Sequence, residues 1–331
     1  MSKALPLPKT LQEAITFLSD EQRTFDYAVK LRWPDGAATC PRCGSKEHSF
    51  ISTRRLWFCK GCKKQFTAKV GTIFEDSALG MDKWMIAVWM IVNCKNGISS
   101  YEIHRALGIT QKSAWFMTHR IRLAMQSKSF VKLGGPSREV EVDETFIGGK
   151  ARNMHLDKRE RRITGTGTTD KVAVMGMLES GGRIRLAVLP NRKKWAMQQR
   201  MRNDIAAGSG LYSDALRSYD GLAQCSAHRV IDYAERHVDG QVHTNGLENF
   251  WSPLKRGIRG TYVNIEPFHL FRYLDEQAFR YNNRGTKENL IKDGDRFLEA
   301  TKHIVGRRVT YQQLTGKDSE IHHETANPGP A

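Results

Sequence analysis

Four cysteines in two pairs carry the clearest chemistry in this sequence. Cys40 and Cys43 form one C-x-x-C pair, Cys59 and Cys62 form a second, and fifteen residues separate the pairs. This spacing is typical of a four-thiolate zinc site, in which two tight turns each present two sulfur atoms to one tetrahedral ion. Apolar segments between the pairs predict a hairpin, the shape of a zinc ribbon. The sequence therefore predicts a structural Zn²⁺ with every coordination position filled by protein.

Glycines and cations surround the two cysteine pairs. Gly44 and Gly61 suit turns that need a positive φ. The cations around the ribbon favour contact with nucleic acid, and a solvated basic face remains the alternative. They are Arg42, Lys46, Arg54, Arg55, Lys60, Lys63 and Lys64.

Three acidic residues further along the chain could bind a different metal. Asp143 lies in a strand-like run at 140–149, Asp214 ends a second strand-like run at 210–214, and Glu248 follows on a predicted helix. Oxygen ligands suit Mg²⁺ or Mn²⁺. Two such ions about 4 Å apart can hold a phosphodiester and activate a water or a sugar hydroxyl. From spacing alone, ordinary solvated carboxylates remain an open interpretation.

The segment that carries Glu248 has the periodicity of an amphipathic helix, with Thr244 or Asn245 as its cap. Its polar face carries Asn245, Glu248, Ser252 and Lys255. Its apolar face carries Leu247, Phe250, Trp251 and Leu254. Pro253 would fall inside this helix and should kink it or end its first part.

Regular elements are expected between these acidic residues. Strand-like runs occupy 172–178 and 183–189, with the pair Gly181 and Gly182 as the turn between them. A helix is expected near 196–205. A strand, a hairpin, a helix and another strand together predict a mixed α/β domain.

A pair of helices before this region predicts a helix-turn-helix. Ser99 and Glu102 form a capping box, Gly108 can end the first helix, and Thr110 can cap the second. The second helix would expose polar and cationic side chains that can contact phosphates and base edges. They are Gln111, Lys112, Ser113, His119, Arg120 and Arg122. An ordinary helical hairpin is the alternative interpretation.

Composition narrows the class of protein. The 331 residues carry 52 Lys+Arg against 35 Asp+Glu, a formal charge of +17, with 40% hydrophobic residues. This is a globular composition, and its length favours two or three domains. The longest apolar run is shorter than the roughly 18–20 residues of a membrane span, so a cytoplasmic protein with reduced thiols is expected. The positive charge favours a nucleic acid as the binding partner. The alternative is a basic protein that has no such partner.

Several motifs resemble those of a known family. HTNGLENFWSPLKRGIRGTY and FRYLDEQAFRYNNR resemble the catalytic signature of bacterial insertion-sequence transposases of the ISXO-like group, which is related to Merlin elements. EVDETFIGGK and YSDALRSY resemble the first and second catalytic strands of that family, and CPRCGS with FCKGCKKQF resembles its zinc ribbon. The resemblance covers about residues 25–284.

The resemblance implies an RNase H-like catalytic domain with a DDE triad of Asp143, Asp214 and Glu248 that binds Mg²⁺ or Mn²⁺. Asn245 would be a neighbour of the third carboxylate, and in some relatives an asparagine takes that role. His243 would form hydrogen bonds near the active site. Lys255 and the adjacent Arg256 would contact DNA at the end of the element. Lys112, Arg120 and Arg122 would contact DNA from the helix-turn-helix.

The expected architecture therefore has four parts. They are an N-terminal region at 1–80 with the ribbon at about 36–70, a helix-turn-helix region at 81–130, the catalytic domain at 138–285, and a basic helical segment and tail at 286–331. The expected function is DNA transposition. The protein would bind terminal inverted repeats, free a 3′-hydroxyl by hydrolysis, and join it to target DNA with no covalent protein–DNA intermediate.

Assembly as a homodimer or a larger oligomer on nucleoid DNA is expected, because two ends must be joined, and no membrane partner is expected. Two other classes remain open. One is a DNA-binding regulator without catalysis. The other is an RNase H-like nuclease that recognises branched DNA.

Overall fold

The computed structural model describes residues 7–127, 131–148, 156–157, 171–191, 193–214, 227–231, 245–263, 265–287 and 289–316, and for residues 214 and 227–231 it describes the backbone. The chain divides into two compact units. The first comprises Met1–Cys94, Ile98–Gln126 and Gly285–Ala331, and the second comprises Lys95–Gly97 and Ser127–Arg284. Within the described residues, no helix is both long and apolar enough to cross a membrane.

The first unit opens with two helices and a small antiparallel sheet of order β1-β2-β3. These elements are α1 (Leu11–Leu18), α2 (Glu21–Arg32), β1 (His48–Ile51), β2 (Leu56–Cys59) and β3 (Gln65–Phe66). The hairpin expected between the cysteine pairs is β1 with β2, joined by the short 3₁₀ turn Ser52–Arg54. Trp33 and Phe66 pack around Trp57 in the core of the ribbon, with ring centroids 5.1 and 5.7 Å from the Trp57 centroid.

Helices complete the first unit. They are α3 (Met81–Asn93), α4 (Ser100–Leu107), α5 (Gln111–Met125), α10 (Asp293–Lys302) and α11 (Tyr311–Leu314). The capping box of Ser99 and Glu102 is present, Gly108 ends α4 with φ +59°, and Thr110 caps α5. The C-terminal α10 packs on α3, where Phe297 lies between Tyr27 and Trp89 at centroid distances of 5.9 and 5.5 Å.

The second unit is a five-stranded sheet with helices on both faces. Its elements are β4 (Glu139–Ile147), β5 (Val172–Glu179), β6 (Ile184–Leu189), α7 (Lys194–Asp204), β7 (Gly210–Asp214), β8 (Ala227–Ile231), α8 (Asn245–Arg256), a π-helix (Gly257–Tyr262), a 3₁₀ turn (Pro267–His269) and α9 (Leu270–Asn282). The strand order is β6-β5-β4-β7-β8. β4, β5 and β6 are antiparallel neighbours, whereas β7 runs parallel to β4, and β8 runs parallel to β7.

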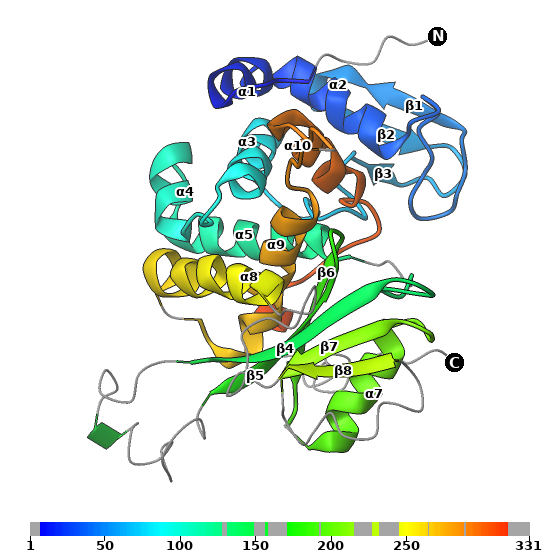
Figure 1. The fold of residues 1–331 in the computed structure, drawn as a ribbon. Helices are drawn as coiled ribbons and strands as arrows, with labels where there is room; N and C mark the ends of the chain where they lie inside the picture. The colour runs from blue at the N-terminus through cyan, green and yellow to red at the C-terminus, as the bar shows by residue number, and fades with distance from the viewer. Residues whose placement is uncertain are drawn as a thin grey trace. The chain divides into compact units, whose positions relative to one another are not determined.

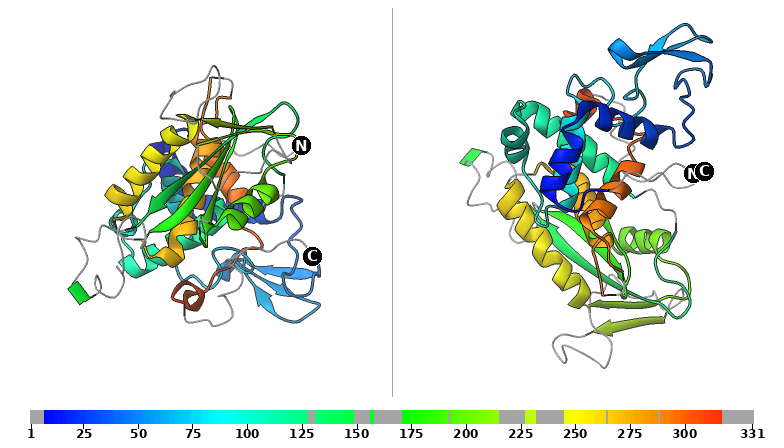
Figure 2. Two further views of the ribbon diagram at one scale, coloured as in Figure 1. Left: turned by 60° about the horizontal axis from the view of Figure 1, so that its bottom comes forward. Right: turned by 90° about the horizontal axis from the view of Figure 1, so that it is seen from above.

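Alternation along β4 sends its side chains to two different cores. Val140 and Val142 pack with Met197 and Met201 of α7 on one face. On the other face α8 and α9 bury a second apolar cluster that includes Leu247 and Leu274. Figure 1 shows α8 and α7 on opposite sides of the sheet, and the left view of Figure 2 shows the strands between them. The mixed α/β layout expected from the sequence is confirmed, with strand ends within two residues of the expected ones.

Pro253 does not have the effect that the sequence predicted. α8 runs through Pro253 to Arg256 and continues directly into the π-helix Gly257–Tyr262. The side chains of Phe250 and Leu254, before and after the proline, are both buried in the same core. This packing holds the helix on the sheet despite the backbone hydrogen bond that proline removes.

Candidate active site

Asp143 lies on the face of β4 that α8 covers. It is half-buried, and each of its two carboxylate oxygens accepts a hydrogen bond. The Trp251 indole Nε1 donates to Oδ2 at 2.8 Å, and the Glu144 backbone N–H donates to Oδ1 at 2.7 Å. These two bonds fix the orientation of the carboxylate group.

Glu248 reaches the same place from α8. The helix buries Leu247, Phe250, Trp251 and Leu254, as the periodicity predicted, and leaves Glu248 exposed. A hollow of about 360 Å³ lies beside this face. It is lined by Asp143, Glu144, Thr145, Glu248, Trp251, Ser252 and Lys255. The structure thus brings the first and third predicted carboxylates, and the predicted cation Lys255, to one surface depression.

Asp214 ends β7, the strand next to β4. The parallel register of β4 and β7 pairs Glu139 with Gly210 and Glu141 with Tyr212. The pairing ends there, and Asp143 and Asp214 each lie two residues beyond its last pair. The side chain of Asp214 and the whole of His243 lie outside the described residues. Asn245 begins α8 and is exposed, and Arg256 at its end is exposed as well.

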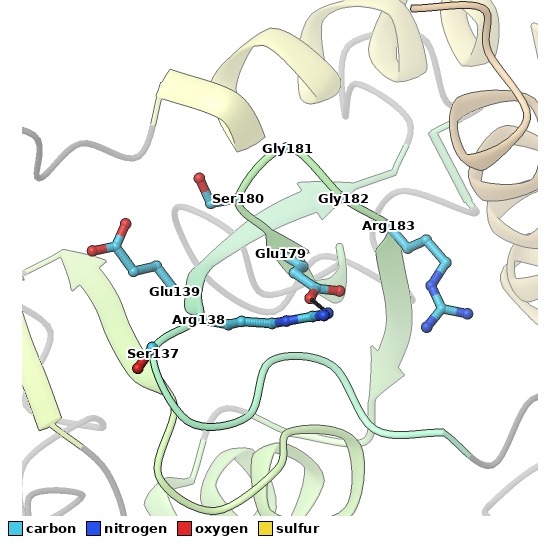
Figure 3. Close-up of a pocket in the computed structure, with 8 residues that line it drawn as sticks. All are labelled: Ser137, Arg138, Glu139, Glu179, Ser180, Gly181, Gly182 and Arg183. Atoms are coloured by element: carbon cyan, nitrogen blue, oxygen red, sulfur yellow. Dashed lines mark hydrogen bonds and ion pairs between the residues drawn. The ribbon is translucent and has the colours of Figure 1, made fainter. Parts of the chain in front are cut away.

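A larger hollow of about 520 Å³ lies around the start of β4 and the β5–β6 turn (Figure 3). Arg138 and Glu179 form an ion pair of 2.6 Å within it. Glu139 points away from this pair, and its carboxylate accepts a hydrogen bond from the Tyr212 hydroxyl. None of the predicted catalytic residues lines this hollow, and its main acidic groups are already engaged. The predicted catalytic residues Asp143 and Glu248 line the smaller hollow instead.

The four predicted zinc ligands converge in the first unit. All four sulfur atoms lie within 4.8 Å of one another, with 3.8 Å between Cys40 and Cys62 and 3.5 Å between Cys43 and Cys59. A tetrahedral Zn²⁺ with Zn–S bonds of about 2.3 Å requires sulfur atoms about 3.8 Å apart. The donor set therefore fits zinc in both chemistry and size. A backbone hydrogen bond from Cys62 is the largest of the contacts that lower the pKa of the Cys59 thiol, whereas the hydrogen bond that Cys43 shares with Cys59 helps to raise the pKa of the Cys43 thiol.

The two cysteine turns have the same backbone geometry. Cys40 N–H donates to Ser45 O, and Cys59 N–H donates to Lys64 O. Gly44 has the expected positive φ of +74°, but the equivalent residue of the second turn is Lys63 with φ +56°. Gly61 is not among the residues with positive φ, so the expectation for it was wrong. The turn needs positive φ four residues after its first cysteine, and Gly61 is only two residues after.

The predicted exposure of the second half of α5 is also wrong. Lys112 is exposed, but Arg120 and Arg122 are each 2% exposed and His119 is fully buried. The reason is that α3, α4 and α10 all pack against α5, which buries most of its circumference beyond the first turn. Cationic side chains are rarely buried without partners, which is why sequence reasoning placed them on the surface.

Arg120 is held by carbonyl and aromatic partners. Its Nη2 donates to Glu75 O at 2.6 Å, and its guanidinium lies 5.5 Å from the Trp84 ring centroid and 5.1 Å from that of Phe116. Burial lowers its pKa to about 10, so it stays charged at neutral pH. It is a structural residue of the first unit.

Two residues at the site escaped sequence reasoning. Trp251 was expected only in the apolar core, yet its N–H reaches Asp143. Glu141 is 6% exposed and accepts a hydrogen bond of 3.0 Å from the Leu247 backbone N–H at the start of α8. A buried tryptophan N–H needs a hydrogen-bond acceptor, and this rule could have indicated a polar partner for Trp251.

Comparison with known proteins identifies two family domains in the chain. Residues 132–282 match the ISXO2-like transposase domain, and residues 19–65 match the transposase zinc-ribbon domain. A protein of the transposable element ISH50 of Halobacterium salinarum is 28% identical over 257 residues, 73% of this chain and 84% of the relative. A transposase-like protein of Haemophilus influenzae is 28% identical over 109 residues, 33% of this chain and 88% of the relative. The chain therefore carries a transposase zinc ribbon followed by an ISXO2-like transposase domain.

Proposed function

We propose that this transposase cleaves and joins DNA in a metal-dependent reaction that uses Asp143, Asp214 and Glu248. One observation carries the proposal. Asp143 from a central strand and Glu248 from α8, far apart in sequence, line the same hollow inside the ISXO2-like transposase domain. Two carboxylates at one hollow repel each other, and a bound cation would offset that repulsion.

An RNase H-like fold for the second unit is part of the proposal. Its support is the strand order β6-β5-β4-β7-β8, with three antiparallel strands followed by two parallel to β4. In this order β4 and β7 are neighbours, so residues at one level of the two strands lie close together. Asp143 and Asp214 each lie two residues beyond the last β4–β7 pair, and Asp214 would be the third ligand.

The chemistry follows from the ligand types. Bound Mg²⁺ or Mn²⁺ would polarise the scissile phosphodiester and favour ionisation of the attacking hydroxyl. Asp143, Asp214 and Glu248 would hold the metal, and Lys255 would pair with a DNA phosphate. The water oxygen attacks phosphorus, the bond from phosphorus to the 3′ oxygen breaks, and a 3′-hydroxyl leaves. That hydroxyl then attacks a target phosphodiester in the same way.

DNA recognition is proposed for the first unit. The helix pair α4 and α5, joined by the short turn at Gly108, would act as a helix-turn-helix, with Lys112 in the first turn of α5 contacting DNA. The ribbon adds exposed cations, among them Arg42, Lys46 and Arg54. Terminal inverted repeats would be the specific partner. Arg256 would contact DNA beside the catalytic hollow, and a dimer or larger assembly would join two ends.

The test is a cleavage and strand-transfer assay with full-length, zinc-loaded protein. Labelled DNA carrying the terminal repeats is incubated with Mg²⁺ or with EDTA, and products are resolved on a denaturing gel. Asp143→Asn and Glu248→Gln should lose cleavage yet shift end DNA in a native gel as the wild type does. The exposed Glu266→Gln, in the same unit, is the matched control and should cleave normally.

Three other outcomes of this assay would each contradict a stated part of the proposed function. Cleavage retained by Asp143→Asn would remove the catalytic assignment. End binding without metal-dependent cleavage in any condition would identify a DNA-binding regulator. Cleavage of branched DNA without terminal repeats, and without joining, would identify a structure-specific nuclease.

A further inference from the structure

We propose that Trp251 is a positioning residue for the metal-binding carboxylate of Asp143, and that Gly176 exists at its position to let the indole reach it. This inference rests on the proposed function, because it assigns a role toward the metal that Asp143 would hold. It concerns a residue that the apolar periodicity of α8 by itself assigns to the core.

The indole makes two different contacts with the sheet. Its Nε1 donates to Asp143 Oδ2 at 2.8 Å, while its benzene ring lies over Gly176. Gly176 is the β5 partner of Asp143 in the antiparallel register. A Cβ atom at Gly176 would lie 2.7 Å from Trp251 Cζ2 and 2.8 Å from Cη2, closer than real Cβ contacts. A side chain at Gly176 would therefore displace the ring that carries the hydrogen-bond donor.

Gly176 meets a need for space here, not for a special backbone conformation. It lies inside a regular strand and is not among the glycines with positive φ. Glycine in a strand interior lowers stability because it has no side chain to pack and costs more backbone entropy. The close approach of the Trp251 ring explains why a glycine is present at position 176 despite this loss of stability.

A second bond fixes the start of the same helix. Glu141 Oε2 accepts from the Leu247 backbone N–H at 3.0 Å, and its two oxygens lie 2.8 Å from where a Cβ of Gly246 would be. Glu141 and Asp143 are two residues apart on one face of β4, and Leu247 and Trp251 are one turn apart on α8. Strand and helix are thus joined by two successive polar bonds.

Glu248 lies between these two bonds along the helix. Its position relative to Asp143 is therefore set by bonds between regular elements and not by loops, which makes for precise ligand placement. Donors to a ligating carboxylate restrict its rotation before the metal arrives, and their loss typically lowers metal affinity or activity by about 10- to 100-fold.

The competing interpretation is that Trp251 only fills the core. Trp251→Phe keeps an aromatic ring there and removes the N–H. A closer match is β-(3-benzothienyl)alanine incorporated at position 251, which replaces the N–H with sulfur and keeps the bicyclic shape. Trp84→Phe is the matched control, because Trp84 is also buried and its Nε1 donates to Ser77 Oγ at 3.0 Å in the first unit.

The experiment measures Mn²⁺ binding to full-length, zinc-loaded protein. The readout is the electron paramagnetic resonance signal of Mn²⁺ that stays free in solution. The expected result is a Kd about tenfold higher for either position-251 variant, and unchanged for Trp84→Phe. The Mn²⁺ concentration that gives half-maximal cleavage should rise by the same factor, with cleavage at saturating Mn²⁺ close to wild type. Gly176→Ala should shift the Kd in the same direction.

Two variants separate failure of this inference from failure of the proposed function. If Asp143→Asn and Glu248→Gln lose Mn²⁺ binding but the benzothienyl protein binds as wild type does, the positioning role is wrong and the metal site stands. If Asp143→Asn and Glu248→Gln themselves bind Mn²⁺ normally, the metal assignment fails and the positioning role fails with it.

Discussion

The contrast between Arg120 and Lys112 gives the sharpest test of how the first unit binds DNA. Both lie on α5, eight residues apart, and the sequence alone assigns both to the DNA surface. The structure buries Arg120 and exposes Lys112. Replacing each with alanine should therefore change two different properties, stability for Arg120 and DNA affinity for Lys112.

The magnitude for Arg120→Ala follows from its contacts. The bond to Glu75 O involves a charged donor and is worth about 1.5–3 kcal/mol. The contacts with the Trp84 and Phe116 rings add about 0.5–1 kcal/mol each, and relief of guanidinium desolvation offsets part of the total. A loss of about 3 kcal/mol is expected. At roughly 2–4 °C per kcal/mol for a unit of this size, Tm should fall by roughly 6–12 °C.

Lys112→Ala should leave Tm within about 2 °C, because exposed substitutions rarely change stability by more than about 0.5 kcal/mol. It should weaken DNA binding and reduce the slope of log affinity against log salt by about 1, the loss of one phosphate contact. Differential scanning calorimetry and gel shifts at several salt concentrations measure both effects. If Arg120→Ala melted like the wild type and instead reduced the salt slope, the buried position of Arg120 would be refuted.

Three further predictions concern the zinc site, the C-terminal segment and a buried ion pair. Removing zinc with a chelator should expose all four ribbon thiols to a thiol reagent and weaken DNA binding; thiols that react equally fast with zinc present would contradict the site. A chain ending at Arg284 should lose cooperative melting of the first unit, measured by calorimetry, because it lacks Phe297 and the strand-like contact of Ile304 O with Ile73 N; an unchanged transition would contradict that role. Glu276→Ala should lower the unfolding free energy by about 3–5 kcal/mol in urea titration, since it leaves the buried Arg280 guanidinium without its carboxylate, whereas a cost near zero would show that water replaces the partner.

Local rules were sufficient for much of the fold. The capping box at Ser99, the turn at Gly108 and the β5–β6 turn at Gly181 were all predicted from residue type and spacing and are present. The apolar stripe of α8 was predicted correctly as well. These features depend on neighbours in the chain, and short-range sterics and hydrogen bonding decide them.

The zinc site was also predictable from sequence. Two C-x-x-C pairs restrict the geometry so strongly that the spacing nearly specifies the ligand set. The acidic site was not predictable from spacing along the chain. Asp143 and Glu248 could be singled out by resemblance to a family, but their meeting depends on how α8 packs on β4. The predicted role of Asp214 stays a prediction that rests on strand register.

Burial around α5 was decided by tertiary structure alone. The residues near Arg120 in the sequence do not predict its contacts with Glu75 O and Trp84, because these partners come from segments that only folding brings together. The same holds for Trp251, whose apolar periodicity is correct while its polar bond to Asp143 is invisible to periodicity. The sequence by itself determined which segments are helices, strands and metal-binding turns. Only the packing of distant segments determined which polar groups are buried, because the partner of a buried polar atom is chosen by three-dimensional proximity and not by spacing along the chain.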